Sequence, residues 1–208
     1  MRIGIVGAGD RGSALAELWG RAGHQIAVGD AEDPAAATAL AERLNVSTRA
    51  MTVEETARFG EVVVLTTPFG RRELLPPPSA VAGNVVIDAM NALTDEGGPL
   101  DLGKASSVLV AEWFPDAVVV KAFNAMEAQA LLTESRTSVP RERRFAVFIA
   151  GDNARANARI STLIEEAGFV PIATGTLARG GRFQEPGSKI FGRQLINAEA
   201  RNVVRMMG

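Results

Sequence analysis

The sequence predicts an α/β fold in which a parallel sheet is covered by helices on both faces. Two observations carry this prediction. Short runs rich in β-branched residues recur along the chain, and segments mostly long enough for helices separate them. The strand-like runs are Arg2–Val6, Gln25–Val28, Val62–Thr66, Val85–Asp88 and Ala117–Lys121. This alternation is typical of parallel strands joined by crossover helices.

The segments between the runs predict where helices form and where they stop. Ser13–Ala22 places its leucines at helical spacing, so we expect a crossover helix after the first run. Pro34–Leu44 is rich in alanine and follows Asp33, a residue type favoured as an N-cap. The Pro76–Pro78 triplet ends any helix after the third run and forces a turn before the fourth.

The C-terminal third of the chain predicts a smaller unit. Thr133–Arg144 is polar and contains Pro140, so we interpret it as a linker. A strand–helix–strand unit, a glycine-rich loop and a final helix are expected at Phe145–Ala150, Ala154–Ala167, Phe169–Ile172, Arg179–Gly187 and near Arg193–Met206. The prediction is therefore an N-terminal domain over 1–132 and a small C-terminal α/β extension over 145–208.

Composition excludes several classes of partner and chemistry. The net charge is −2 and the basic residues are scattered, so we expect no nucleic-acid partner and no binding to anionic membranes. The chain has no cysteine, which excludes disulfides and cysteine-ligated metals and suits a reducing compartment. Apolar runs are far shorter than a membrane span, and no export signal is recognisable at the N-terminus. We expect a cytoplasmic protein.

A glycine-rich loop follows the first strand-like run and indicates the ligand. Residues 7–12 fit the pattern GxGxxG with Gly7, Gly9 and Gly12, and Asp30 ends the second strand-like run, roughly 20 residues later. The first glycine allows the tight turn, the second admits a pyrophosphate, and the third lets helix and strand pack closely. The alternative is a turn that merely needs glycine.

The strand–glycine loop–helix order predicts a doubly wound Rossmann sheet, and the C-terminal strand–helix–strand unit is expected to be an extension of it. The predicted phosphate and ribose contacts of a nicotinamide dinucleotide are Gly7, Gly9, Asp10, Arg11, Gly12 and Asp30. Small or polar residues at three later strand ends are expected to line its nicotinamide half: Thr66, Thr67, Pro68, Asn91, Ala122, Phe123 and Asn124.

Several catalytic groups are missing. The chain has no tyrosine, which excludes a Tyr-x-x-x-Lys proton donor, and its one histidine, His24, falls at the wrong end of the predicted sheet. No metal site is expected. Lys121 is near a ligand-facing strand end, where we expect its head in water rather than a role as proton donor. No catalytic residue is assigned, and the pattern favours hydride transfer to an acceptor that needs little acid–base help, such as a flavin or deazaflavin.

Longer segments resemble one family. The segments are Arg2–Gly12, Val64–Pro68, Val86–Asn91, Val119–Asn124, Phe148–Asp152 and Glu166–Phe169. They are similar to the coenzyme F-420-dependent NADP oxidoreductase family, and the Lys-Ala-Phe-Asn segment at 121–124 is the most specific of them. The resemblance implies NADP as the cofactor, hydride exchange with coenzyme F-420 or a related acceptor, and a homodimer. It also implies that the C-terminal extension closes the cofactor cleft.

Two positions differ from that family. Its members follow the second strand with Gly-Ser-Arg, which holds the 2′-phosphate of NADP, whereas this chain has Gly29-Asp30-Ala31. We therefore predict a preference for NAD(H), with Arg11 as the residue able to neutralise a 2′-phosphate instead. The C-terminal loop is glycine-rich, and Arg179, Arg182 and Arg193 are candidates for an anionic acceptor tail.

Two other functions stay open at this point. The first is a non-catalytic sensor that binds a dinucleotide and reports its redox state. The second is a reductase of imines or carbonyls resembling pyrroline-carboxylate reductase, which usually carries a long C-terminal helical region, whereas this sequence stops at Gly208.

Overall fold

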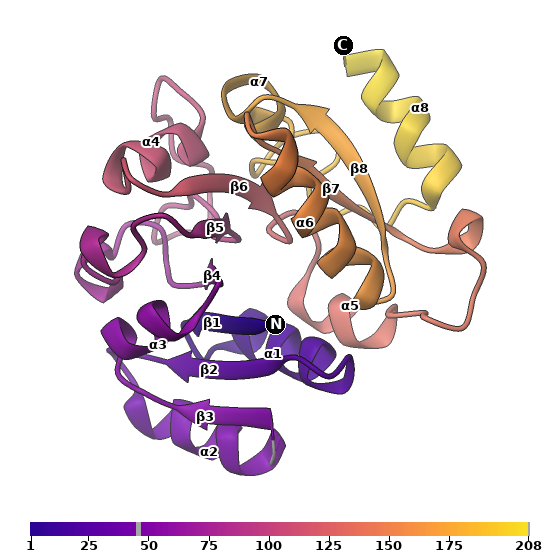
Figure 1. The fold of residues 1–208 in the computed structure, drawn as a ribbon. Coiled ribbons are helices and arrows are strands. Elements are labelled where there is room, and N and C mark those ends of the chain that lie inside the picture. The colour runs from indigo at the N-terminus through magenta and orange to yellow at the C-terminus, as the bar shows by residue number, and fades with distance from the viewer. Residues whose placement is uncertain (45–46, 208) are drawn as a thin grey trace.

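A computed structural model describes residues 1–44 and 47–207; Gly208, the last residue of the predicted C-terminal extension, lies outside the described residues. The described strands form one sheet in the order β3-β2-β1-β4-β5-β6-β7-β8 (Figure 1). Their bounds are β1 Arg2–Val6, β2 Gln25–Gly29, β3 Thr48–Ala50, β4 Val62–Leu65, β5 Val85–Asp88, β6 Val118–Ala122, β7 Ala146–Ala150 and β8 Val170–Gly175.

The pairing of the strands confirms the Rossmann fold. Strands β1 to β6 pair in parallel, and the order reverses between β1 and β4, where Ile3 pairs with Val62. Strand β7 then joins β6 in the antiparallel direction, and β8 runs parallel to β7. Ligands of open α/β sheets bind at such a reversal, outside the carboxyl ends of the strands. The C-terminal segment therefore extends the same sheet, and the division into 1–132 and 145–208 stays a prediction.

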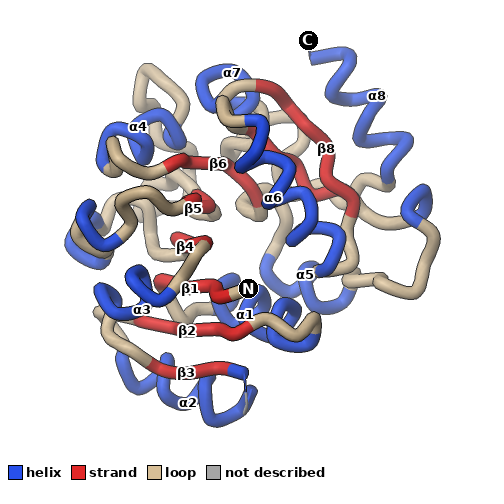
Figure 2. Tube along the Cα trace, viewed as in Figure 1, coloured by secondary structure: helices blue, strands red, loops and turns tan. Residues whose placement is uncertain are grey.

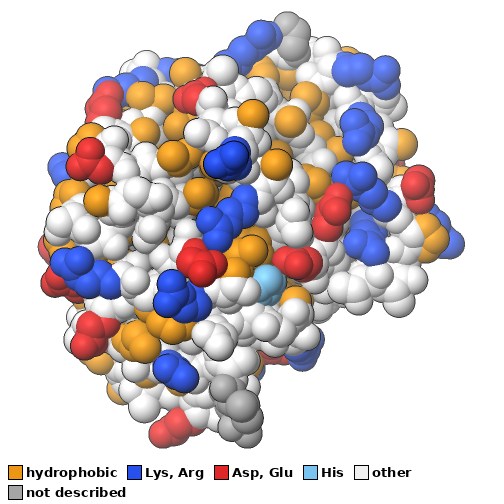
Figure 3. All heavy atoms as spheres, in the orientation of Figure 1, with side chains coloured by type: hydrophobic (Ala, Val, Ile, Leu, Met, Phe, Trp, Pro, Cys, Tyr) orange, Lys and Arg blue, Asp and Glu red, His pale blue; other side chains and the backbone are white. Residues whose placement is uncertain are grey.

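The helices alternate with the strands, as Figure 2 shows. They are α1 Asp10–Arg21, α2 Pro34–Leu44, α3 Val53–Phe59, α4 Ser106–Trp113, α5 Ala128–Thr133, α6 Ala154–Glu166, α7 Leu177–Arg182 and α8 Asn197–Met207, with short 3-10 turns at Arg72–Leu74, Pro78–Ala80 and Arg141–Arg143. None of the described helices is long and apolar enough to cross a membrane. On the face drawn in Figure 3, acidic, basic and hydrophobic side chains are interspersed.

Local chemistry explains where two of these helices begin. The Asp33 carboxylate accepts the N–H of Ala36 at 2.9 Å, which confirms Asp33 as the cap of α2. The prediction of a loop over Arg179–Gly187 is wrong for residues 179–182, because these residues belong to helix α7. The hydroxyl of Thr176 accepts the N–H of Arg179 and caps that helix, a local bond that the glycine content of the segment conceals.

Side chains point alternately to the two faces of the sheet and so contribute to two main hydrophobic cores. Ile3, Ile5 and their neighbours face α1, α5 and α6, while Val6 and Val63 face the side covered by α3, α4 and α7. Helix α8 covers a third, smaller cluster on β7 and β8. The buried indole of Trp19 donates to the carbonyl of Leu163 at 3.0 Å and so ties α1 to α6.

Lys121 was predicted to keep its head in water, and the structure corrects this. Its side chain is fully buried, with Nζ 3.0 Å from Oδ2 of Asp88 and 2.6 Å from the carbonyl oxygen of Met90. Asp88 Oδ1 also accepts the N–H of Met90 at 3.1 Å. Lys121 points to the same face of the sheet as Val119, into the packed interior. Its position near a strand end in the sequence does not reveal this direction. The ion pair fixes the turn that follows β5.

Replacing one member of this pair is expected to destabilise the fold. Lys121→Met leaves Asp88 buried without a countercharge, so we expect the free energy of unfolding to fall by about 3–5 kcal/mol. Urea denaturation measures the change. Lys104→Met is the control, because Lys104 pairs with Glu112 at the surface and its loss should cost less than about 1 kcal/mol. Equal losses in the two variants would contradict the prediction.

Candidate functional site

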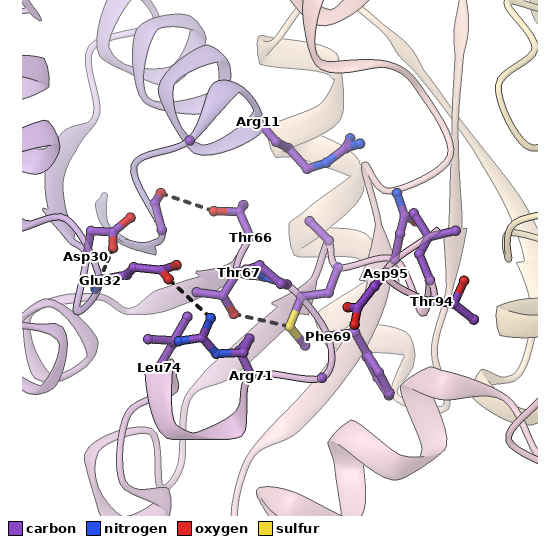
Figure 4. Close-up of a pocket in the computed structure, with 18 residues that line it drawn as sticks. Arg11, Asp30, Glu32, Thr66, Thr67, Phe69, Arg71, Leu74, Thr94 and Asp95 are labelled. Carbon is purple, nitrogen blue, oxygen red and sulfur yellow. Dashed lines mark hydrogen bonds and ion pairs between the residues drawn. The ribbon is translucent and has the colours of Figure 1, made fainter. Parts of the chain in front are cut away.

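A cavity of about 670 Å³ lies at the carboxyl ends of β1, β2, β4 and β5, at the reversal of strand order (Figure 4). Its walls include eight of the predicted binding residues: Gly7, Gly9, Arg11, Asp30, Thr66, Thr67, Pro68 and Asn91. The predicted residues Asp10, Gly12, Ala122, Phe123 and Asn124 are not among its lining residues.

The three glycines of the loop differ in what surrounds them. Gly7 has a φ of +107°, and a Cβ there would lie 2.6 Å from Oγ1 of Thr66. A Cβ on Gly12 would lie 2.0 Å from the carbonyl oxygen of Gly7, so helix α1 is packed directly on the turn. Gly9 has open space around its missing Cβ and lines the cavity. These are the surroundings that a turn, a phosphate approach and a helix contact require.

Helix α1 presents its N-terminus to this open space. Gly9 is its N-cap, with no side-chain cap, and the first backbone N–H groups of any helix have no partner within it. They carry a partial positive charge, which favours an anion. Oγ1 of Thr66 donates to the carbonyl oxygen of Val6 at 2.9 Å and so anchors the end of β4 to the glycine turn.

Asp30 lies just after β2, beside the glycine turn. Oδ2 accepts the N–H of Ala8 at 2.7 Å, and Oδ1 accepts the N–H groups of Glu32 and Asp33, each at 2.9 Å. Partial burial alone would raise the pKa of Asp30, but these three N–H groups together hold the pKa below its ordinary value. The side chain is therefore a carboxylate at neutral pH.

Arg11 does not lie where a 2′-phosphate would need it. Its half-buried guanidinium donates to the carbonyl oxygens of Phe123 and, at 2.7 Å, of Met126. Burial lowers the pKa of Arg11 to about 10, so the side chain stays charged at neutral pH. Figure 4 shows it extending away from Asp30. The interpretation that Arg11 neutralises a 2′-phosphate finds no support in this position.

The strand end after β6 lies behind the cavity wall. Ala122, Phe123 and Asn124 are all buried, and the ring of Phe123 packs edge-on against Trp19 at 5.4 Å. The Asn124 amide donates to Oδ1 of Asn91 at 3.1 Å and to the carbonyl oxygen of Gln184 at 2.7 Å. Asn124 therefore holds the wall residue Asn91 and the C-terminal segment together, and direct contact of residues 122–124 with a ligand stays a prediction.

The cavity also has walls that the sequence interpretation missed. They come mainly from the loops after β4 and β5, and include Glu32, Phe69, Arg71, Leu74, Thr94 and Asp95. The sequence feature that could have identified them is their position just after the carboxyl ends of strands that lie near the reversal of strand order. Arg179, Arg182 and Arg193 are not among its described lining residues, and Arg182 instead donates to the carbonyl oxygen of Gly103.

The cavity wall combines polar and apolar groups. Gly9 and Asp30 are among the polar contributors, and Phe69, Met90 and Leu93 are among the apolar ones. Among the described lining residues the titratable side chains are arginine, aspartate and glutamate. His24 is buried elsewhere, with Nε2 3.0 Å from the Glu166 carboxylate, in line with the structural role expected for it.

Fold and cavity together define an α/β protein of the Rossmann class, with its cavity where that class holds dinucleotides. Residues 2–92 match the family model described as NADP oxidoreductase, coenzyme F420-dependent. The chain belongs to this family of NADP-dependent oxidoreductases, as the resemblance predicted.

Similar proteins cover nearly the whole chain. A hypothetical protein from Sinorhizobium meliloti is 30% identical, with 95% of each chain covered and a TM-score of 0.81. A proposed F420-dependent NADP reductase from Arthrobacter sp. FB24 shares the fold at 23% identity, with 95% of this chain and 100% of that chain covered and a TM-score of 0.75.

The curated relatives are longer proteins. The metalloreductase STEAP3 of Rattus norvegicus is 28% identical over 179 residues, which are 85% of this chain and 34% of that protein. The metalloreductase STEAP2 of Homo sapiens is 22% identical over 91% of this chain and 36% of its own length. The chain therefore spans about a third of the length of these relatives.

The glycine loop gives a direct test of this site. Gly9→Val fills the open space beside the helix N-terminus, so we expect the Kd for NADH to rise at least about tenfold. Stability should fall by no more than about 1 kcal/mol, because the backbone of Gly9 is extended and valine is only a poorer N-cap. Gly12→Val is the contrast, with a loss of about 1–3 kcal/mol from its backbone clash. A folded Gly9→Val protein with unchanged affinity would contradict the assignment.

Proposed function

We propose that this protein is a nicotinamide-dependent oxidoreductase that transfers hydride between NAD(H) and a small redox acceptor, a deazaflavin such as coenzyme F-420 or a flavin. One observation carries the proposal. The open space at Gly9 faces a helix N-terminus, and it belongs to the same cavity as the Asp30 carboxylate. Family membership in the NADP oxidoreductases supports it.

The lining residues fit a dinucleotide from end to end. The N-terminus of α1 would hold the pyrophosphate, and Asp30 would hold the adenosine ribose. Three N–H groups already occupy the Asp30 carboxylate, which has about four acceptor positions. One position is thus left for a ribose hydroxyl. Thr67, Met90 and Asn91 would border the nicotinamide ring.

Hydride chemistry would be supplied by the nicotinamide ring and the acceptor. The chain's own residues would orient them and limit the access of water. Phe69 and Met90 are almost fully buried and offer an apolar surface at that end. The Asp88–Lys121 pair holds the backbone of Met90 by its N–H and its carbonyl oxygen, so the wall is rigid where two rings must meet in a fixed geometry.

The end of β2 favours NAD(H) over NADP(H). A 2′-phosphate beside Asp30 would meet a carboxylate whose pKa is already held low. Position 31 is alanine and supplies no guanidinium. Such an unpaired like charge costs about 1–3 kcal/mol, which corresponds to roughly a ten- to hundredfold difference in affinity. The homodimer, the cytoplasmic location and the closing of the cleft by residues 145–208 stay predictions.

A non-catalytic redox sensor is the second candidate. The observation that favours it is that the cavity's lining, among the residues the structure describes, contains no histidine, lysine, tyrosine or cysteine to act as an acid or base. A sensor would bind NADH without oxidising it. An imine or carbonyl reductase is the third, and it would need a proton donor for its product.

A panel of acceptors separates these candidates. The protein is mixed with NADH or NADPH and with F-420, FMN, FAD, quinones, ketones or cyclic imines, and absorbance is followed. We expect NADH to be consumed with F-420 or a flavin. Tight NADH binding with no turnover on any acceptor would favour the sensor, and turnover confined to imines or ketones would favour the third candidate.

Exchanging the end of β2 should reverse the cofactor preference. In Asp30→Ser, Ala31→Arg the carboxylate is lost and a phosphate-binding guanidinium is gained, so we expect NADPH to bind more tightly than NADH. The Kd values are measured by titration of both cofactors at low and high salt, because screening weakens charge effects. Tighter binding of NADPH than NADH by the unmodified protein would refute the predicted preference.

A further inference from the structure

We propose that Arg71 is the residue that reads the 2′ position of the adenosine ribose, and that Glu32 competes with the cofactor's 2′-phosphate for its guanidinium. The proposal rests on the dinucleotide binding proposed above and adds a specificity device to it. The end of β2 lacks the serine and arginine that hold a 2′-phosphate in the family, so a cation for that phosphate would have to come from another part of the cleft.

Arg71 and Glu32 face each other across the cavity. Nη1 of Arg71 lies 3.1 Å from Oε1 of Glu32, and Figure 4 shows this ion pair joining the loop after β4 to the loop after β2. Both side chains line the cavity. Nε of Arg71 also donates to Glu73, a neighbour on its own loop that is not a lining residue.

The contact places Arg71 beside the ribose site. The N–H of Glu32 donates to Oδ1 of Asp30 at 2.9 Å, so the backbone that carries Glu32 is fixed to the ribose-binding carboxylate. Glu32 in turn holds the Arg71 guanidinium. A group on the 2′ oxygen of a ribose bound at Asp30 would therefore meet Glu32 and Arg71 next.

Charge singles out Arg71 among the described residues of the cavity. Its lining cations are Arg11 and Arg71. Arg11 is engaged by the carbonyl oxygens of Phe123 and Met126 at the other end. Arg71 is bound by carboxylates only at an exposed surface, with side chains of Arg71 and Glu32 that are 48% and 56% exposed.

The exposure decides how the pair responds to a phosphate. Surface ion pairs contribute little to stability, so Arg71 can leave Glu32 without a structural penalty. A phosphate offers a guanidinium two charge-assisted hydrogen bonds in matching geometry. Glu32 weakens that exchange by holding the Arg71 guanidinium. The ratio of NADPH to NADH affinity thus depends on both side chains as well as on Asp30.

Four proteins test this coupling: the unmodified chain, Arg71→Met, Glu32→Gln and the double variant. The Kd for NADH is measured by fluorescence titration, and NADPH, ADP and 2′,5′-ADP are measured by competition against it. We expect Arg71→Met to weaken NADPH and 2′,5′-ADP about tenfold while NADH and ADP change less than about twofold. Glu32→Gln should strengthen NADPH and 2′,5′-ADP about three- to tenfold, and the double variant should show no gain over Arg71→Met.

Glu54→Gln is the matched control, because it removes the same charge from an exposed ion pair with Arg58 that lies outside the cavity wall. It should leave all four ligands unchanged. If the double variant bound NADPH more tightly than Arg71→Met, Glu32 would act only by repelling the phosphate, and the proposal would be overturned. Equal losses for NADH and NADPH in Arg71→Met would overturn it too. Failure of the unmodified chain to bind NADH would instead overturn the proposed function.

Discussion

The close contact between helix α1 and the glycine turn is the constraint on which the site depends. Gly12 leaves no room for a Cβ against the carbonyl of Gly7, and Thr66 bonds to the same turn from β4. Backbone therefore packs on backbone at the reversal of strand order. This contact brings the helix N-terminus, the end of β2 and the end of β4 around one space. The rest of the cavity wall is built around this contact between α1 and the glycine turn.

The sequence predicted the parts of the fold that local patterns encode. The parallel strands followed from β-branched runs, and the glycine spacing located the turn and Asp30. Strand β3 escaped prediction because its three residues, Thr48–Ala50, carry no apolar alternation and gain their place only by pairing with β2. The antiparallel direction of β7 was not foreseen either, since strand direction is set by how the chain returns to the sheet after Thr133–Arg144.

The differences between the sequence interpretation and the folded site share one physical cause, which is that tertiary packing fixes the direction of a side chain. Lys121 and Arg11 were placed near the correct strand ends, but one is paired inside the core and the other grips the backbone after β6. Phe123 and Asn124 are buried and are not among the described lining residues, and their contact with a ligand stays a prediction. Conversely, Glu32 and Arg71 are ordinary exposed loop charges in the sequence, and only the folded chain brings them together.

Phe123 has a consequence for how this chain can diverge. Its backbone has a φ of +65°, a conformation that favours glycine, yet its ring fills the space beside Trp19. Glycine at this position would relax the backbone and empty part of the core, while any other large residue would keep the strain. Arg11 holds the strained carbonyl. The residue identities at positions 11, 19 and 123 are thus expected to co-vary among related sequences.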